Sequence, residues 1–331
     1  MPQFPTAATL RPLLGHRLVI VSGKGGTGKT SVAAALALAG ASAGKRVLVA
    51  EVGRDEHLPR VLAPGSPPVG YAGRELRPRL SAMRIDPYAA LGEYLGLQLR
   101  VRSAVELVLR NRAFRQLMDA SPGWRELITL GKVWHLEQMR DAQGAPRFDL
   151  LVVDAPATGH GISFLDVPRV VVSAVRSGPL RRNAELVEEM IADQNRTLLL
   201  PVALAEELPA RETVELVAKV RGELRIALDR IVVNALTARP FPPGLEELDA
   251  QLARIPPEPG WPNLPLPRVV AACAAHLRSR YELNRVYVAE IARATGLPVV
   301  PLPFLPSGIR GLEDLRRLGE PLLATHVADA A

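Results

Sequence analysis

The stretch GKGGTGKT, residues 23–30, decides the fold of this chain. It follows the apolar run HRLVIVSG (16–23), which predicts a buried strand, and it opens the alanine-rich run 29–45, which predicts a helix. The spacing G-x-x-x-x-G-K-[ST] lets successive backbone N–H groups of the loop face one anion. The helix that follows points its N-terminus at the same anion. The stretch therefore predicts a loop that binds the phosphates of a nucleotide.

Two lysines lie in this loop, although only five of the 41 lysine and arginine residues of the chain are lysines. We expect Lys29 to reach the β- and γ-phosphates and the Thr30 hydroxyl to ligate Mg²⁺. Lys24 lies at a position that the spacing leaves free, so the motif alone does not explain it. The loop residues expected to line the nucleotide are Gly23, Lys24, Gly25, Gly26, Thr27, Gly28, Lys29, Thr30 and Ser31.

Buried strands alternate with helices along the rest of the chain. Apolar runs predict strands at 46–52, 148–156, 169–175, 196–204, 228–236 and 297–303, and helical patterns lie at 210–224, 268–296 and 309–322. This alternation predicts a single α/β domain over 1–331 with a doubly wound, mostly parallel sheet. The helical pattern of 86–145 indicates an insertion subdomain, and the proline-rich stretch 239–268 indicates an extended surface excursion.

The composition of the chain narrows the classes of function. Its 331 residues carry a formal net charge of +7, but arginines are spread along the chain without a long basic run, so we expect no specific nucleic acid partner. The single cysteine, Cys273, excludes an internal disulfide and a CxxC metal site, and its apolar neighbours predict that it packs in the core. We find neither a signal peptide pattern nor an apolar segment of bilayer length, and expect a cytoplasmic protein.

The full string GKGGTGKT resembles the deviant phosphate loop of a large class of ATPases. That class includes chromosome-partitioning and division-site ATPases, nitrogenase iron proteins and the ArsA/Get3 family, and its extra lysine crosses a dimer interface to the partner's nucleotide. The resemblance implies that Lys29 acts within its own subunit and Lys24 on the partner. It therefore implies an ATPase that binds ATP and Mg²⁺ as a homodimer or as a dimer of paralogues.

A second motif is similar to switch II of the ArsA/Get3 family. The stretch LLVVDAPATGHGISFLDVP (150–168) places Asp154 at the end of a strand, where the resemblance implies binding of Mg²⁺ through water. It also implies that Gly159 permits loop movement and that Thr158 and His160 belong to the same switch. For His160, a structural role is nearly as well supported as a role in the switch loop.

Two stretches resemble the adenine side of that family. In RIVVNAL (230–236), Asn234 ends a strand, and its amide can pair with a donor and an acceptor on the base edge. The stretch PFLPSGIRGLEDL (303–315) is similar to the C-terminal adenine-side loop and places Pro303 at the nucleotide. The resemblance thus adds Asn234 and Pro303 to the expected nucleotide contacts.

The switch I stretch departs from the family pattern. The family has an aspartate after the second strand, whereas AEVGRDEHLPRVL (50–62) places Glu51 there. We expect Glu51, or nearby Asp55, to position the attacking water for slow hydrolysis. The alternative is that Glu51 is a strand-end residue that only contacts the loop, which leaves open a nucleotide-gated scaffold with little hydrolysis.

The partner of the ATPase is less defined by the sequence. One cysteine cannot supply the metalloid site of the arsenite-pump ATPase, and Met118 and Met139 are too few for the methionine-rich groove of tail-anchored-protein targeting members. We expect an unidentified client protein or membrane component. The arginines of the helical insert could face an acidic partner, although a solvated surface is favoured; they are Arg100, Arg102, Arg110, Arg112 and Arg115. A ParA/MinD-like partitioning ATPase is a further alternative that the switch II string disfavours.

Overall fold

A computed structural model describes residues 12–53, 55–99, 105, 107, 109–120, 123–156, 161–241, 248–255 and 267–324. The described residues form an eight-stranded sheet with the order β3-β4-β2-β5-β1-β6-β7-β8. All neighbouring strands are parallel except β3 and β4, which are antiparallel. The predicted doubly wound, mostly parallel α/β fold is confirmed. The strands are β1 Leu18–Ser22, β2 Val47–Val52, β3 Arg74–Arg77, β4 Leu80–Ile85, β5 Leu150–Asp154, β6 Thr197–Leu204, β7 Ile231–Leu236 and β8 Val299–Pro303.

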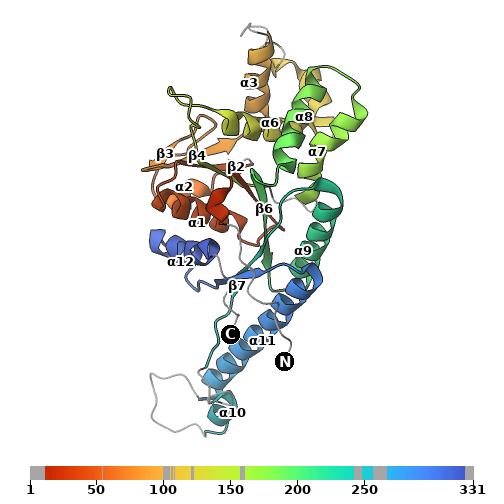
Figure 1. Ribbon diagram of the computed structural model, residues 1–331. Coiled ribbons are helices and arrows are strands. Elements are labelled where there is room, and N and C mark those ends of the chain that lie inside the picture. Colours follow the sequence, from red (N-terminus) through yellow and green to blue (C-terminus); the bar gives the residue numbers. More distant parts are fainter. Residues whose placement is uncertain are drawn as a thin grey trace.

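Helices cover both faces of this sheet (Figure 1). In Figure 1, α1, α2 and α12 lie on one side, α9 and α11 lie on the other, and α3, α6, α7 and α8 gather at one end of the molecule. The far half of α11 extends past the sheet and carries α10. The α-helices are α1 Lys29–Ser42, α2 Leu58–Leu62, α3 Pro87–Leu99, α5 Arg112–Ala120, α6 Trp124–Gln138, α7 Gly161–Ala174, α8 Pro179–Ala192, α9 Glu207–Lys219, α10 Leu248–Ala253, α11 Pro267–Thr295 and α12 Leu312–Leu323; the short 3₁₀-helix η1 is Leu13–Gly15 and the π-helical turn η2 is Val220–Leu224.

The central strand β1 shows why these layers form. All five of its residues are buried, as expected for a parallel strand covered on both faces. Val19 and Val21 belong to the apolar core that includes α1 and α12, whereas Leu18 and Ile20 belong to the core beneath α6, α7 and α8. Alternate side chains of one strand thus bind the two helical layers together.

The prediction of a strand over 169–175 was wrong, because Arg169–Ala174 form the last turns of α7. The valine run favours a strand by propensity, but tertiary packing overrides it. Phe164 and Leu165 of α7 are buried under the sheet, while Val170 is 52% exposed on the opposite side of the helix. The sequence patterns predicted neither α8 nor the β3–β4 hairpin, whose edge strand is the charged stretch RELR.

The long predicted helix is α11, and Gly296, with a φ of 64°, follows its last residue. Cys273 lies on this helix and is exposed, so the prediction that it packs in the core was wrong: the part of α11 that carries it lies beyond the sheet. Within the proline-rich stretch 239–268, the structure describes the short helix α10, while 242–247 and 256–266 lie outside the described residues. The proposed subdomain at 86–145 contains α3, α5 and α6.

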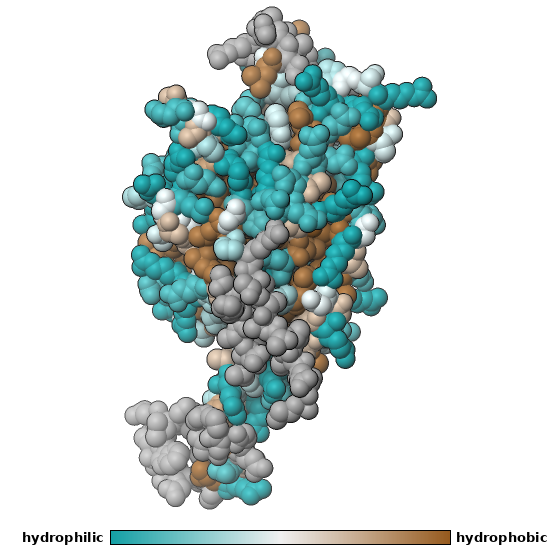
Figure 2. All heavy atoms as spheres, viewed as in Figure 1, coloured by the Kyte–Doolittle hydropathy of each residue, from teal (hydrophilic) through white to brown (hydrophobic). Residues whose placement is uncertain are grey.

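The face of the molecule in Figure 2 is mainly hydrophilic, with apolar atoms in separate patches. Among the described residues, no helix combines the length and the apolar character needed to cross a membrane.

Glu137, near the end of α6, joins the helical layer to the amino ends of two strands. Its carboxylate accepts a hydrogen bond from Arg17 Nε at 2.7 Å and another from Arg196 Nη2, and these arginines directly precede β1 and β6. Burial alone would raise the pKa of Glu137, but the hydrogen bonds from Arg196 and Arg17 lower it below its usual value. Glu137 is therefore a buried carboxylate held by two guanidinium groups.

Candidate functional site

The loop between β1 and α1 needs glycine at two positions for steric reasons. Gly23 and Gly28 have φ angles of 150° and 88°, which side chains rarely adopt. A Cβ atom at Gly23 would lie 2.2 Å from the Val202 carbonyl oxygen on β6, and one at Gly28 would lie 2.2 Å from Asn234 Nδ2 on β7. The backbone of β6 thus leaves no room for a side chain at Gly23, and the Asn234 amide fills the space beside Gly28.

Lys29 is the first residue of α1, and its ammonium group turns back into the loop. Lys29 Nζ donates to the Lys24 carbonyl oxygen at 2.9 Å, and Thr27 Oγ1 donates to the same oxygen at 2.9 Å. Burial lowers the pKa of Lys29, and the charge of Asp154 opposes this effect. No side chain caps the N-terminus of α1 and no acidic residue lies in its first turn. The first-turn N–H groups and one ammonium group can therefore serve a bound anion.

Asp154 and Thr30 meet at the carboxyl ends of β5 and β1. Thr30 Oγ1 donates to Asp154 Oδ2 at 2.5 Å, and Val21 on β1 is the register partner of Asp154. The other carboxylate oxygen, Oδ1, is buried and has no hydrogen-bond partner among the described residues. Burial raises the pKa of Asp154 to about 6; the Thr30 hydrogen bond opposes the rise and the Glu51 charge adds to it. Burial of this carboxyl group therefore costs free energy in the folded state, because one of its oxygens lacks a hydrogen bond.

Glu51 lies beside Asp154, because the two residues are register partners in β2 and β5. The residue Glu51 is 5% exposed. Its carboxylate accepts hydrogen bonds from the backbone N–H group of His57, at 2.8 and 3.0 Å, and from that of Leu58, at 3.1 Å. His57 Nδ1 is 2.7 Å from Glu51 Oε1. The carboxylate therefore binds the backbone at the start of α2, while Asp55 is exposed. His57 was not predicted as a site residue, since nothing in the spacing of 50–62 marks it.

On the other side of the loop, Asn234 of β7 contacts the loop backbone. Its Nδ2 atom donates to the Thr27 carbonyl oxygen at 3.0 Å, so one N–H of the amide supports the loop. Pro303 ends β8 as the register partner of Leu236. The expected adenine contacts thus lie on adjacent strands, and the role of both residues in binding the base stays a prediction.

Lys24 has a partner that its place in the sequence does not predict. Its Nζ atom lies 2.5 Å from Oε1 of Glu212 on α9, and the two side chains are 35% and 42% exposed. Glu212 belongs to the amphipathic run predicted as a helix, in which no feature separates it from other solvent-facing glutamates. Only the fold brings residues 188 positions apart together.

The remaining predicted residues are only partly described. Gly25 and Gly26 are exposed in the loop, and Ser31 is half-buried in the first turn of α1. The switch II residues Thr158, Gly159 and His160 lie outside the described residues.

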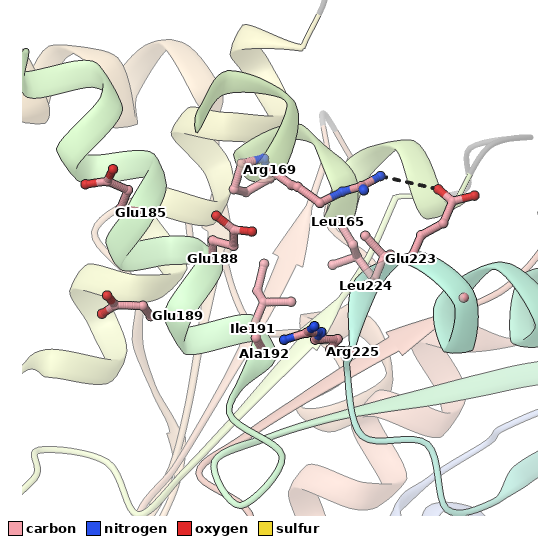
Figure 3. Close-up of a pocket in the computed structure, with 12 residues that line it drawn as sticks. Leu165, Arg169, Glu185, Glu188, Glu189, Ile191, Ala192, Glu223, Leu224 and Arg225 are labelled. Atoms are coloured by element: carbon pink, nitrogen blue, oxygen red, sulfur yellow. Dashed lines mark hydrogen bonds and ion pairs between the residues drawn. The ribbon is translucent and has the colours of Figure 1, made fainter. Parts of the chain in front are cut away.

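A cavity of about 550 Å³ lies between α7, α8 and η2 (Figure 3). Its walls carry Glu185, Glu188 and Glu189 of α8 and Arg169 of α7, and Arg169 Nη2 is 3.4 Å from Glu223 Oε2. None of its described lining residues belongs to the glycine loop. Charged side chains thus line this cavity together with Leu165, Ile191 and Leu224, which belong to the apolar core between α7, α8 and η2.

Comparison with known proteins identifies relatives of the chain. The family model described as anion-transporting ATPase matches residues 16–180. The chain is 34% identical over 242 residues to ATPase BagA of Mycobacterium tuberculosis, covering 72% of this chain and 69% of that protein. It is 28% identical over 221 residues to the arsenical pump-driving ATPase of Escherichia coli, covering 61% of this chain and 36% of that protein. It is also 23% identical over 342 residues to ATPase GET3 of Kluyveromyces lactis, covering 92% and 89%.

Proposed function

Since the chain belongs to the anion-transporting ATPase family and is an ATPase that binds nucleotide, we propose that it works as a dimer whose two sites bind Mg²⁺ with ATP. Turnover of the nucleotide then switches the shape of the dimer for a client protein or a membrane component. The observation that carries the proposal is the convergence of the glycine loop, the uncapped start of α1, Lys29 and the Thr30–Asp154 pair at the ends of β1 and β5.

The chemistry of Thr30 and Asp154 fits a bound magnesium ion. A hydroxyl and a carboxylate are oxygen ligands of the kind that Mg²⁺ prefers, and the buried Oδ1 atom of Asp154 lacks a hydrogen-bond partner among the described residues. Thr30 would contact the ion directly and Asp154 through water. When bound, the ion neutralises negative charge on the phosphate oxygens.

The loop residues would position the phosphates. Lys29 reaches the phosphate region with an ammonium group whose pKa burial lowers, so it gains from an anionic partner. The first-turn N–H groups of α1 add donors at the positive end of a 14-residue helix. Catalysis by such a site consists mainly of positioning and electrostatic stabilisation of the transferred phosphoryl group.

Glu51 remains our proposed catalytic carboxylate, and its contacts define how it must act. Its hydrogen bonds with the start of α2 would have to rearrange before the carboxylate could orient a water. This requirement supports slow turnover. The same contacts favour the second candidate, a nucleotide-gated scaffold in which Glu51 mainly holds α2 and hydrolysis is a minor activity.

The conformational switch would use α7, which follows the switch II segment. The cavity of about 550 Å³ beside α7 supports this proposal, because it leaves open space on one side of the helix into which α7 can shift (Figure 3). Such a shift would be passed to α6 and α8, which pack with α7 over the sheet.

Mixing two inactive variants tests whether the dimer shares its lysines. In a heterodimer of Lys24→Ala and Glu51→Gln subunits, the site with an intact Glu51 receives an intact Lys24 from the partner. Random pairing should therefore restore about a quarter of the parent turnover, since half of the dimers carry one complete site of two. Phosphate release from Mg²⁺-ATP measures this, and each variant alone is the control. If the mixture stays as inactive as its components, Lys24 does not act on the partner.

A further inference from the structure

Lys24 is restrained within its own subunit through two different parts of the residue. Its ammonium group lies 2.5 Å from Glu212 Oε1 on α9. Its carbonyl oxygen accepts hydrogen bonds from Lys29 Nζ and from Thr27 Oγ1, each at 2.9 Å. The side chain that would cross to a partner and the peptide that carries it are thus both held in place.

A phosphate in the loop competes for one of these contacts. The Lys29 ammonium group donates to a neutral carbonyl, whereas a phosphate oxygen carries a negative charge, so a bond to phosphate adds the Coulombic attraction of opposite charges to the hydrogen bond. An anion bound at the start of α1 would therefore draw Lys29 away from the Lys24 carbonyl oxygen. The Lys24 carbonyl oxygen then keeps only the weaker bonds from neutral donors of Thr27, its hydroxyl at 2.9 Å and its backbone N–H at 3.4 Å.

The contact with Glu212 is weak enough to be exchanged. Its side chains are 35% and 42% exposed, and ion pairs with this much solvent contact are screened by water and salt. A nucleotide phosphate carries more negative charge than one carboxylate and can replace Glu212 as the partner of the ammonium group. The pair therefore biases the position of Lys24 without fixing it permanently.

We propose that Lys29 and Glu212 together form a latch that keeps Lys24 within its own subunit until a phosphate enters the same loop. Glu212 is then a positioning residue for the lysine that reaches the partner, and the latch rests on the proposed function because it requires Lys24 to act there. A subunit offers its lysine to the partner's nucleotide only after its own site is filled. The latch thus couples the two sites and favours turnover by a doubly loaded dimer.

Glu212→Gln tests the latch because glutamine keeps the size of the side chain and removes its charge. The matched control is Glu215→Gln on the same helix, which removes an ion pair with Arg211 whose side chains are 77% and 65% exposed. Turnover is measured against protein concentration at saturating ATP and against ATP at fixed protein concentration. We expect Glu212→Gln to lower the half-maximal protein concentration by up to about fivefold, the range of an exposed ion pair. The Hill coefficient for ATP should fall toward one, and both effects should shrink at high salt.

The outcomes separate the latch from the proposed function. If Glu212→Gln behaves like Glu215→Gln while Lys24→Ala is inactive, the latch is refuted and the proposed function stands. If Glu212→Gln lowers turnover at every protein concentration, Glu212 serves the active dimer and does not restrain Lys24. If Lys24→Ala keeps full turnover, the proposed role of this lysine fails and the latch fails with it.

Discussion

Replacing Asp154 by asparagine removes a buried negative charge and keeps the size of the side chain. Burial raises the pKa of Asp154 from an ordinary 3.8 to about 6. At about 1.4 kcal/mol per pKa unit, ionising this carboxyl at neutral pH costs the folded state roughly 3 kcal/mol relative to the unfolded chain. The asparagine amide oxygen can still accept the hydrogen bond from Thr30. We therefore expect Asp154→Asn to raise the free energy of unfolding at pH 7.5 by about 1–3 kcal/mol.

The stability difference between Asp154→Asn and the parent should depend on pH in one direction. The pKa of Asp154 in the folded state lies above its pKa in the unfolded state. The neutral carboxyl group therefore contributes to the stability of the parent protein below about pH 4, and this contribution is lost as the pH rises through about 6. Urea unfolding followed by circular dichroism between pH 4 and pH 8, without magnesium, measures the difference between parent and variant. The advantage of the variant should grow across this window and then level off.

Adding Mg²⁺ with ATP is a control in which the parent, and not the variant, should gain more stability. Mg²⁺ with ATP should stabilise the parent more than the variant, since asparagine brings no charge to the ion. A stability difference that does not change with pH, or a variant less stable than the parent at pH 7.5, would refute the argument from burial. Equal stabilisation of both proteins by Mg²⁺ with ATP would refute the proposed role of Asp154 with the ion.

Three further substitutions, two of them with a matched control substitution, test other parts of the structure. Lys29→Ala should weaken ATP binding at least tenfold in calorimetry, with unchanged circular dichroism, because it removes the buried ammonium group of the loop. Glu137→Gln should lower the free energy of unfolding by about 2–4 kcal/mol, since two guanidinium groups lose a buried partner; Glu313→Gln, whose side chain is 86% exposed, should change it by less than about 0.5 kcal/mol. Gly23→Ala should destabilise the protein in thermal unfolding by at least about 2 kcal/mol, because its Cβ atom would lie 2.2 Å from a carbonyl oxygen, whereas Gly26→Ala meets no atom within 4 Å and should cost about 1 kcal/mol.

The parts of the fold that could be predicted are those with a strong local signal. The apolar runs at 16–23 and 148–156 contain β1 and β5, and the glycine spacing at 23–30 marked the turn between β1 and α1. The run at 169–175 misled because a valine-rich helix and a valine-rich strand have the same composition, and only packing against the sheet decides between them. The hairpin β3–β4 was missed because its edge strand consists mostly of charged residues.

The candidate site divides in the same way. Lys29, Thr30 and Asp154 could be named from motifs, because the chemistry of phosphate and magnesium fixes their residue types and spacing. Glu212 and His57 could not, since they reach the site through contacts made by α9 and by the loop before α2. The contacts of Glu51 show the same limit. Its position at a strand end was evident from the sequence, but its hydrogen bonds with the start of α2 depend on how the chain returns after β2.

The two arginines that hold Glu137 constrain how α6 can move. They anchor one end of this 15-residue helix at the amino ends of the central strands β1 and β6, whereas the glycine loop follows the carboxyl end of β1. Because α6 is held at this end, it cannot translate along its axis and can only rotate about the held end. Since the helix is about 22 Å long, a swing of about 10° would carry its unpinned end through about 4 Å. Any displacement that reaches α6 therefore becomes a rotation of the helix, and its residues move farther the more distant they are from Glu137.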